Sequence, residues 1–188
     1  MSRVARSSSL KMAFEQETGA QPPLGFWDPL GLLDNADQDR FDRLRFVELK
    51  HGRVSMLAVA GHIVTTAGVR LPGTIDLDGT TFDSIPTGLG GLGAIPAFGL
   101  IQLFLSIGIW ELTVWEQVEG STPGDFGIPF LSFVDTEEKQ EAARAKELNN
   151  GRAAMMGILA LMVHEKLDNN PYMINSLLGV PVDFNAGL

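Results

Sequence analysis

The residues of this chain that could do chemistry occur in two copies of one charged hexapeptide. Residues 48–53 read Glu-Leu-Lys-His-Gly-Arg, and residues 147–152 read Glu-Leu-Asn-Asn-Gly-Arg. Each copy leads into an apolar stretch without formal charge, at residues 54–64 and 153–163. The flanks repeat in the same register, with Arg45, Met56 and Val64 matching Arg144, Met155 and Val163. Two long segments of the chain are therefore copies of one helical unit.

The charges of the two hexapeptides can neutralise one another. If the apolar stretches are membrane helices, each charge in the apolar layer costs roughly 2.5–3.5 kcal/mol unless it is paired. A pseudo-twofold axis would bring Glu48 to Arg152 and Glu147 to Arg53. The glycine of each hexapeptide would let the two backbones approach closely where the helices cross. The repeat therefore predicts a crossed helix pair held by two structural ion pairs.

The remaining polar groups of the hexapeptides are suited to bind a metal as single ligands. On a helix, Glu48 and His51 lie near one face, and Glu147 and Asn150 do the same on theirs. Carboxylate, amide oxygen and imidazole can each supply one axial ligand to a metal that is already held in an equatorial ring. Magnesium in a chlorin fits, because it is a hard ion that accepts such groups.

At this point the chain resembles a known family. The paired Glu-x-x-His-x-Arg and Glu-x-x-Asn-x-Arg helices are similar to those of the light-harvesting chlorophyll-binding superfamily, and the details resemble its fucoxanthin chlorophyll a/c branch. The segments that carry this likeness are residues 22–32, 41–53, 85–86 and 157–165, within a matching region of about residues 12–168. The resemblance implies an all-α membrane protein with three transmembrane helices, of which the first and third form the crossed pair.

We expect these helices at about residues 37–68, 91–116 and 136–167 of a pigment-binding domain spanning residues 12–168. Start signals precede the first and third helices, and Gly68 followed by Pro72 ends the first. A proline- and glycine-rich entry loop at residues 20–32 has a counterpart at residues 123–129, which extends the repeat to loop plus helix.

Four further residues are candidate pigment ligands. The resemblance favours Glu111 and, less firmly, Gln102 on the second helix, although Glu111 could instead lie at the membrane surface. His164 follows Asn150 by fourteen residues, which places it near the same face and the opposite membrane surface; the alternative is a solvated histidine. His62 follows His51 by eleven residues and could bind a pigment, or it could be a hydrogen-bonded structural histidine.

The composition argues against some functions, but it does not by itself identify a membrane protein. The formal net charge of −9 argues against a nucleic-acid partner. The hydrophobic fraction of 45% and the mean hydropathy of +0.11 are ordinary for a soluble protein. Only residues 84–110 are charge-free for long enough to span a membrane unaided. The other two spans are recognisable because their charges can pair.

Targeting and orientation follow from the basic residues. Residues 1–11 are basic, serine-rich and free of acidic residues, as expected of a transit-peptide remnant. We expect an apolar signal segment upstream of them. The mature protein is expected to begin at Met12. Lysine and arginine gather near the start of the first helix and in the second loop. By the positive-inside rule the N-terminus faces the stroma, and residues 169–188 form a lumenal tail.

The sequence therefore predicts a thylakoid antenna protein of a plastid, not an enzyme. The resemblance implies chlorophyll a, chlorophyll c, fucoxanthin and other, diadinoxanthin-like carotenoids as cofactors. It implies a photosystem core, neighbouring antenna subunits and thylakoid lipids as partners. Two alternatives stay open. One is a member of the same superfamily that quenches excitation, for which acidic residues on the lumenal side, such as Asp76, would be the marker. The other is a small membrane transporter that uses the charged pairs. The absence of a central proline break in either repeat helix argues against the transporter.

Overall fold

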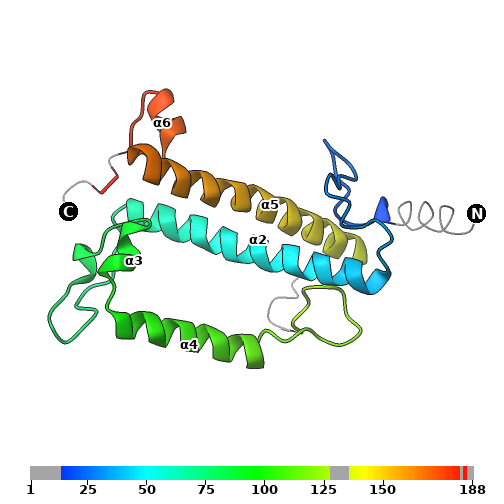
Figure 1. The fold of residues 1–188 in the computed structure, drawn as a ribbon, viewed down its shortest axis with the longest axis horizontal. Helices are drawn as coiled ribbons and strands as arrows, with labels where there is room; N and C mark the ends of the chain where they lie inside the picture. The colour runs from blue at the N-terminus through cyan, green and yellow to red at the C-terminus, as the bar shows by residue number, and fades with distance from the viewer. Residues whose placement is uncertain (1–13, 128–135, 183, 186–188) are drawn as a thin grey trace, which may run out of the picture. The chain divides into compact units, whose positions relative to one another are not determined.

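The computed structural model describes residues 14–127, 136–182 and 184–185 (Figure 1). Its described residues form the helices α2 (Gln38–Thr66), α3 (Gly90–Ala94), α4 (Ala97–Thr113), α5 (Glu137–Asp168) and α6 (Met173–Leu177), and the 3-10 helix η1 (Phe82–Ser84). The chain divides into two compact units. The first comprises Met1–Arg53 and Gln117–Ala153, and the second comprises Val54–Glu116 and Ala154–Leu188, so α2 and α5 contribute residues to both.

The helical fold class is confirmed: the described residues hold two isolated β-bridges and no strand. The first and third expected helices correspond to α2 and α5, with boundaries that differ by one or two residues from those expected. Among the helices of the described residues, none is both long enough and apolar enough to qualify as a membrane span. The expected transit-peptide remnant at residues 1–11 lies outside the described residues.

The second expected helix is interrupted, which corrects the prediction of one continuous element over residues 91–116. The short helix α3 ends at Ala94, and Ile95 is extended with a ψ of 132°. Pro96 explains the break, because proline lacks the amide hydrogen that a helix needs and disfavours helical backbone in the residue before it. The charge-free stretch 84–110 is therefore divided among η1, α3 and α4, and α4 has 17 residues.

In the first unit, a small aromatic cluster fixes the chain that enters α2. The rings of Phe14 and Phe41 stack with their centroids 4.5 Å apart, and both side chains are buried together with Ala36. Phe26 and Leu33 of the entry loop pack against this cluster. The apolar contacts hold the loop beside the first turns of α2, where the charged hexapeptide begins ten residues beyond Gln38.

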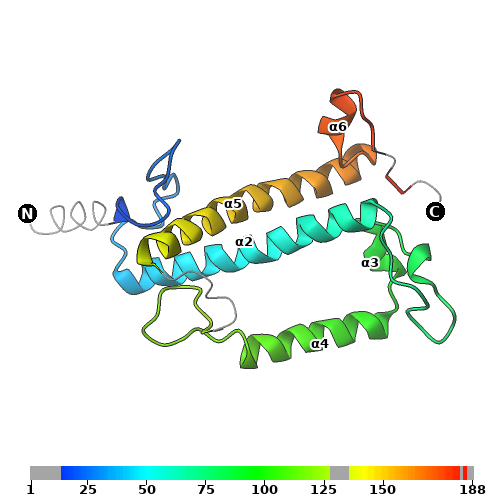
Figure 2. The same ribbon diagram turned by 180° about the vertical axis from the view of Figure 1, so that it is seen from behind.

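In the second unit, the chain before α3 is attached to α5 through one carboxylate. Glu165 accepts a hydrogen bond from the backbone amide of Leu89 at 2.8 Å, and its carboxylate lies against Gly88. Thr87 donates its backbone amide to Asn185 near the C-terminus at 2.9 Å. Figure 2 shows α3, α5 and α6 from the reverse side. The segment expected as a lumenal tail thus contains a short helix and contacts the rest of its unit.

The connector between α2 and η1 forms a tight turn closed by one aspartate. Asp76 accepts hydrogen bonds from the hydroxyl of Thr80 at 2.7 Å and from its backbone amide at 2.8 Å. A bridge between Thr74 and Thr81 closes the base of the turn. The hydroxyl of Thr80, followed by its amide, lowers the pKa of the Asp76 carboxyl, because both hydrogen bonds favour the ionised form.

This turn should resist mild acid. The folded-state pKa of Asp76 lies below the unfolded value of about 3.9. The stabilisation is therefore complete above that unfolded value and is lost as the pH falls through the folded-state pKa. The amide shift of Thr80, followed by NMR against pH, should titrate below the ordinary aspartate range, and Asp76→Asn should abolish that titration, whereas Asp78→Asn should leave it. A titration midpoint above the ordinary value would contradict the assignment.

Candidate functional site

The two hexapeptide glycines lie in contact within the first unit, where α2 approaches α5 (Figure 1). A Cβ atom placed on Gly52 would lie 2.9 Å from the Cα atom of Gly151, and one placed on Gly151 would lie 3.0 Å from the Cα atom of Gly52. Both glycines are buried. Because the obstacle on each side is backbone, the approach requires glycine in both hexapeptides.

Two ion pairs join the helices beside this contact. The Nε of Arg53 lies 2.6 Å from Oε1 of Glu147, and the Nε of Arg152 lies 2.7 Å from Oε1 of Glu48. The four side chains are between 29% and 39% exposed, so the pairs are partly screened by solvent in the protein alone. The structure thus brings together the four charges that the repeat paired, each carboxylate meeting the arginine of the other helix.

Each of these arginines also binds the loop that precedes a hexapeptide. Arg152 donates from Nη1 to the carbonyl of Gly19 at 2.9 Å, and Arg53 donates from Nη1 to the carbonyl of Gly124 at 2.8 Å. The sequence repeat indicated that the loops correspond, but not that their carbonyls bind the ion-pair arginines. A guanidinium has five donors in a fixed plane, so it can bind a carboxylate and a carbonyl together. In each half of the repeat, the arginine of one helix therefore binds the glutamate of the other helix and the carbonyl of the loop that precedes that glutamate.

His51 is oriented in the way that a metal ligand requires. Its Nδ1 lies 2.8 Å from the carbonyl oxygen of Val47. A carbonyl can only accept a hydrogen bond, so Nδ1 carries the hydrogen and the lone pair belongs to Nε2. The side chain is exposed, as is that of Asn150 on α5. Both residues are therefore accessible to a ligand outside the protein, and in the neutral imidazole of His51 the Nε2 atom carries the lone pair.

His62 lies in a different environment, buried in the second unit. Its Nδ1 lies 2.9 Å from the hydroxyl of Tyr172, which in turn donates to Thr66 at 3.3 Å. The ring of Phe184 stacks on the imidazole with the centroids 5.7 Å apart. These contacts fit a hydrogen-bonded structural histidine, the alternative to a pigment ligand. They also show that His62 attaches the C-terminal segment to α2.

The remaining candidate ligands also lie in the second unit. His164 of α5 is half-buried, with its Nδ1 3.9 Å from a carboxylate oxygen of Asp168 one turn later. Gln102 is exposed on α4, and Glu111 is half-buried near the end of that helix. All three belong to the second unit, whereas the two ion pairs belong to the first.

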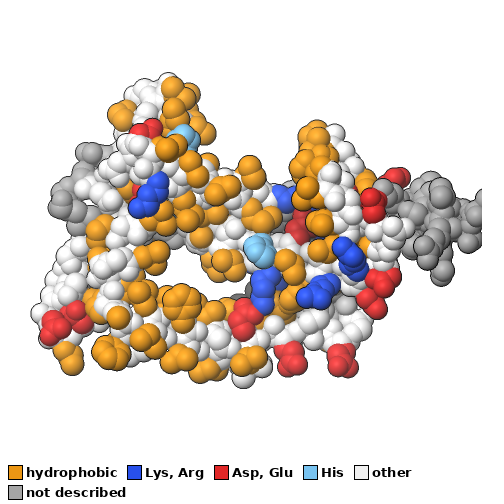
Figure 3. Space-filling model, viewed as in Figure 1, with side chains coloured by type: hydrophobic (Ala, Val, Ile, Leu, Met, Phe, Trp, Pro, Cys, Tyr) orange, Lys and Arg blue, Asp and Glu red, His pale blue; other side chains and the backbone are white. Residues whose placement is uncertain are grey.

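Helix α4 exposes apolar side chains around its whole circumference. None of its residues is buried. Among its large side chains, Phe98 and Leu112 are each 81% exposed and Phe104 is 72% exposed. Figure 3 shows hydrophobic side chains gathered along α4. A helix that is apolar all round requires a nonpolar environment that the protein itself does not supply.

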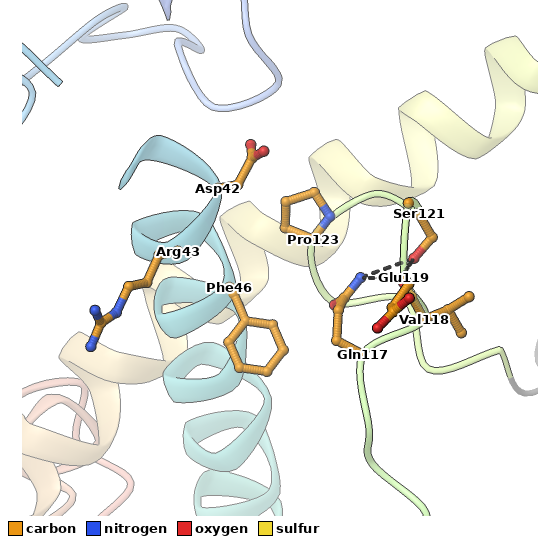
Figure 4. A pocket seen from close by; sticks show the side chains of 9 residues that line it. Asp42, Arg43, Phe46, Gln117, Val118, Glu119, Ser121 and Pro123 are labelled. Carbon is orange, nitrogen blue, oxygen red and sulfur yellow. Dashed lines mark hydrogen bonds between the residues drawn. The ribbon is translucent and has the colours of Figure 1, made fainter. Parts of the chain in front are cut away.

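A hollow of about 470 Å³ lies in the first unit and was not predicted from the sequence. Its lining comprises Asp42, Arg43, Phe46, Gln117, Val118, Glu119, Gly120, Ser121 and Pro123. In Figure 4 the ring of Phe46 on α2 points toward the loop that carries Gln117 and Pro123, while Arg43 points away from it. Gln117 donates to Ser121 at 2.9 Å and accepts from the amide of Gly124 at 2.8 Å, which fixes the loop.

Sequence reasoning missed this hollow because its walls are about seventy residues apart and carry no repeated motif. The size is within the range of small-molecule sites, and the ring of Phe46 offers an apolar wall. None of the candidate ligands lines it.

Comparison with known proteins identifies the family of the chain. The family described as "Chlorophyll A-B binding protein" matches residues 14–166. Fucoxanthin-chlorophyll a-c binding protein D, chloroplastic, of Macrocystis pyrifera is 58% identical over 183 residues, covering 94% of this chain and 100% of the relative. Fucoxanthin-chlorophyll a-c binding protein A, chloroplastic, of Phaeodactylum tricornutum is 54% identical over 168 residues, covering 87% and 86%. The resemblance seen in the sequence is confirmed: the chain belongs to the chlorophyll a-b binding protein family.

Proposed function

We propose that this protein is a photosynthetic antenna that binds chlorophylls and carotenoids and passes excitation energy to a photosystem. The observation that carries the proposal is the pair of glutamates at the helix contact, each neutralised by an arginine of the other helix. A carboxylate balanced in this way can bind the magnesium of a chlorin without leaving a net charge in an apolar layer. The family match and the names of the relatives support the same conclusion.

The proposed magnesium ligands are side chains whose oxygen or nitrogen atoms could each supply one ligand. In the first unit these are Glu48, His51, Glu147 and Asn150, and in the second unit Gln102, Glu111 and His164. When bound, chlorophyll supplies light absorption and excitation transfer. The protein makes and breaks no bonds; its side chains fix the position, tilt and surroundings of each pigment. The names of the relatives favour chlorophyll a, chlorophyll c and fucoxanthin. Diadinoxanthin-like carotenoids are a further part of the proposal.

The histidine of the first hexapeptide should hold one pigment. His51→Leu should remove about one chlorophyll per protein and spare the fold, because the imidazole is exposed and its hydrogen bond within the described residues goes to the carbonyl of Val47 in its own helix. Chlorophyll per protein, measured after reconstitution, and the helical circular dichroism test this. His62→Leu is the matched comparison, which should weaken the packing of the C-terminal segment with no specific pigment loss. An unchanged chlorophyll count in His51→Leu would show that His51 is not a ligand.

Three membrane spans are part of the proposal. At 1.5 Å per residue, α2 and α5 are about 43 and 48 Å long, and α4 is about 25 Å long. The first two exceed the apolar layer of about 30 Å, and their charges pair where they cross. The exposed apolar surface of α4 suits lipid and pigment tails. We place the protein in the thylakoid membrane, with a stromal N-terminus, a photosystem core and neighbouring antenna subunits as partners.

A quenching role that responds to lumenal acid receives no support from Asp76. Hydrogen bonds lower the pKa of this carboxyl, so it stays ionised in mild acid and does not act as a proton sensor. Asp76→Asn should accordingly leave the excitation lifetime of the pigmented protein in mild acid equal to that of the wild type.

The fluorescence excitation spectrum of the purified protein tests the antenna function. Light absorbed by the carotenoid should give chlorophyll emission, because excitation transfer requires that the protein hold both pigments close together. Bound pigments without that transfer would contradict the proposal.

A further inference from the structure

The two glutamates of the helix contact differ in how many arginines bind them. Oε1 of Glu48 accepts from Arg152 at 2.7 Å, and Oε2 accepts from the Nη1 of Arg45 at 2.8 Å. Arg144 occupies the position that matches Arg45 in the repeat, but it is exposed and forms no ion pair with Glu147 in the described part of the chain. Within the described residues, Glu48 therefore has a guanidinium on each oxygen, whereas Glu147 accepts from Arg53 at Oε1 alone.

The additional arginine is held firmly against the protein. Its side chain is 15% exposed, compared with 39% for Arg152. The guanidinium lies over the ring of Phe41 at 5.2 Å, and its terminal nitrogens pack against Gly19 of the entry loop so closely that a Cβ atom there would clash. Arg45 is thus fixed at three places: the carboxylate of Glu48, an aromatic ring and a loop.

This arrangement leaves one surplus positive charge beside Glu48. Two arginines face one glutamate there, while one arginine faces Glu147. Glu17 is the other carboxylate close enough to act on Arg45, but its side chain is exposed and screened by solvent. A carboxylate whose two oxygens both accept charged hydrogen bonds is a weaker electron donor to a metal than one with a free oxygen.

We propose that Arg45 makes the two pseudo-symmetric pigment sites unequal. It withdraws electron density from the glutamate that binds one chlorophyll and adds a fixed positive charge beside that pigment alone. The excitation energy of the chlorophyll at Glu48 then differs from that of its counterpart at Glu147. Arg45 acts through Glu48 and so is a positioning residue that tunes one pigment. This inference rests on the proposed function, because it requires chlorophyll at both glutamates.

The test compares the absorption spectra of reconstituted Arg45→Gln and wild-type protein at low temperature and equal pigment content. Glutamine keeps one hydrogen-bond donor and removes the charge. The expected result is a shift of the lowest-energy absorption band of one chlorophyll, with the chlorophyll count unchanged. Arg45→Lys, which keeps the charge, should restore most of the wild-type position. Arg144→Gln is the matched control at the equivalent, exposed position and should leave the spectrum unchanged.

Three results would overturn the inference. One is an Arg45→Gln spectrum that superimposes on the wild type at full pigment content. Another is an equal shift in Arg144→Gln, which would show a general effect of net charge. The third is a failure of Arg45→Gln to assemble with pigment, which would make Arg45 a folding residue. A colourless wild-type protein would instead refute the proposed function itself, so the two failures can be told apart.

Discussion

Arg53→Leu is expected to prevent pigment-dependent assembly. The substitution removes the guanidinium that lies 2.6 Å from Glu147 and that also binds the carbonyl of Gly124. In the proposed membrane arrangement, the carboxylate is then left uncompensated in the apolar layer, at a cost of roughly 2.5 kcal/mol or more. The loop that carries Gly124 loses its attachment as well. The yield of pigmented protein after reconstitution measures the effect.

A second substitution that removes the partner charge distinguishes the effect of the unpaired charge from the effect of the lost structural contacts. Arg53→Leu combined with Glu147→Gln removes both charges and keeps an oxygen ligand on α5, so it should recover part of the assembly lost in the single variant. Arg144→Leu removes an exposed arginine and should assemble normally. Normal pigment assembly in the single variant Arg53→Leu would refute the crossed ion pairs as the basis of the fold.

Gly52→Leu should separate the two helices. A Cβ atom at this position would already lie 2.9 Å from the Cα atom of Gly151, and backbone cannot move aside as a flexible side chain can. Overpacking a closely fitted contact costs about 1–3 kcal/mol, and separating the helices also lengthens both ion pairs. We therefore expect lower thermal stability of the pigmented protein and a lower pigment yield.

Gly61→Leu is the matched control for this prediction, because Gly61 also lies in α2 and a Cβ atom there would have no neighbour within 4 Å. It should retain pigment and gain up to about 1 kcal/mol of helix propensity. Thermal melting followed through the chlorophyll absorption compares the two variants. Equal melting temperatures would show that the close approach at Gly52 is unimportant.

The repeat carried most of what could be predicted from the sequence. Two aligned hexapeptides determine which glutamate can meet which arginine, because the pairing follows from symmetry and does not need side-chain detail. The same symmetry could not show that Arg45 binds Glu48 while Arg144 stays exposed. That difference depends on how Arg45 packs against Gly19 and the ring of Phe41, which are contacts without a local pattern in the sequence.

Local chemistry explains the one error in the helices. A long charge-free stretch suggested a continuous second helix, but Pro96 within it removes a hydrogen-bond donor and forces Ile95 to be extended. Hydrophobicity was given more weight than the proline. The hollow beside Phe46 was missed for a different reason, since its walls meet only after the chain has folded.

The two histidines of α2 show that helical spacing alone does not predict whether a side chain is buried. His51 and His62 fall close to the same stripe of the helix by their spacing, yet His51 is exposed and His62 is buried against Tyr172. Spacing gives the direction of a side chain but not what packs over it. The C-terminal segment, which covers His62, has no repeat or motif that would have placed it there.

The most direct test of the antenna function is the pigment content of the protein purified in a mild detergent. The arrangement of paired glutamates predicts several chlorophylls per chain together with carotenoid, in fixed proportion from one preparation to the next. A folded, stable and colourless protein would contradict it, because the four charges at the helix contact would then serve only to hold α2 and α5 together.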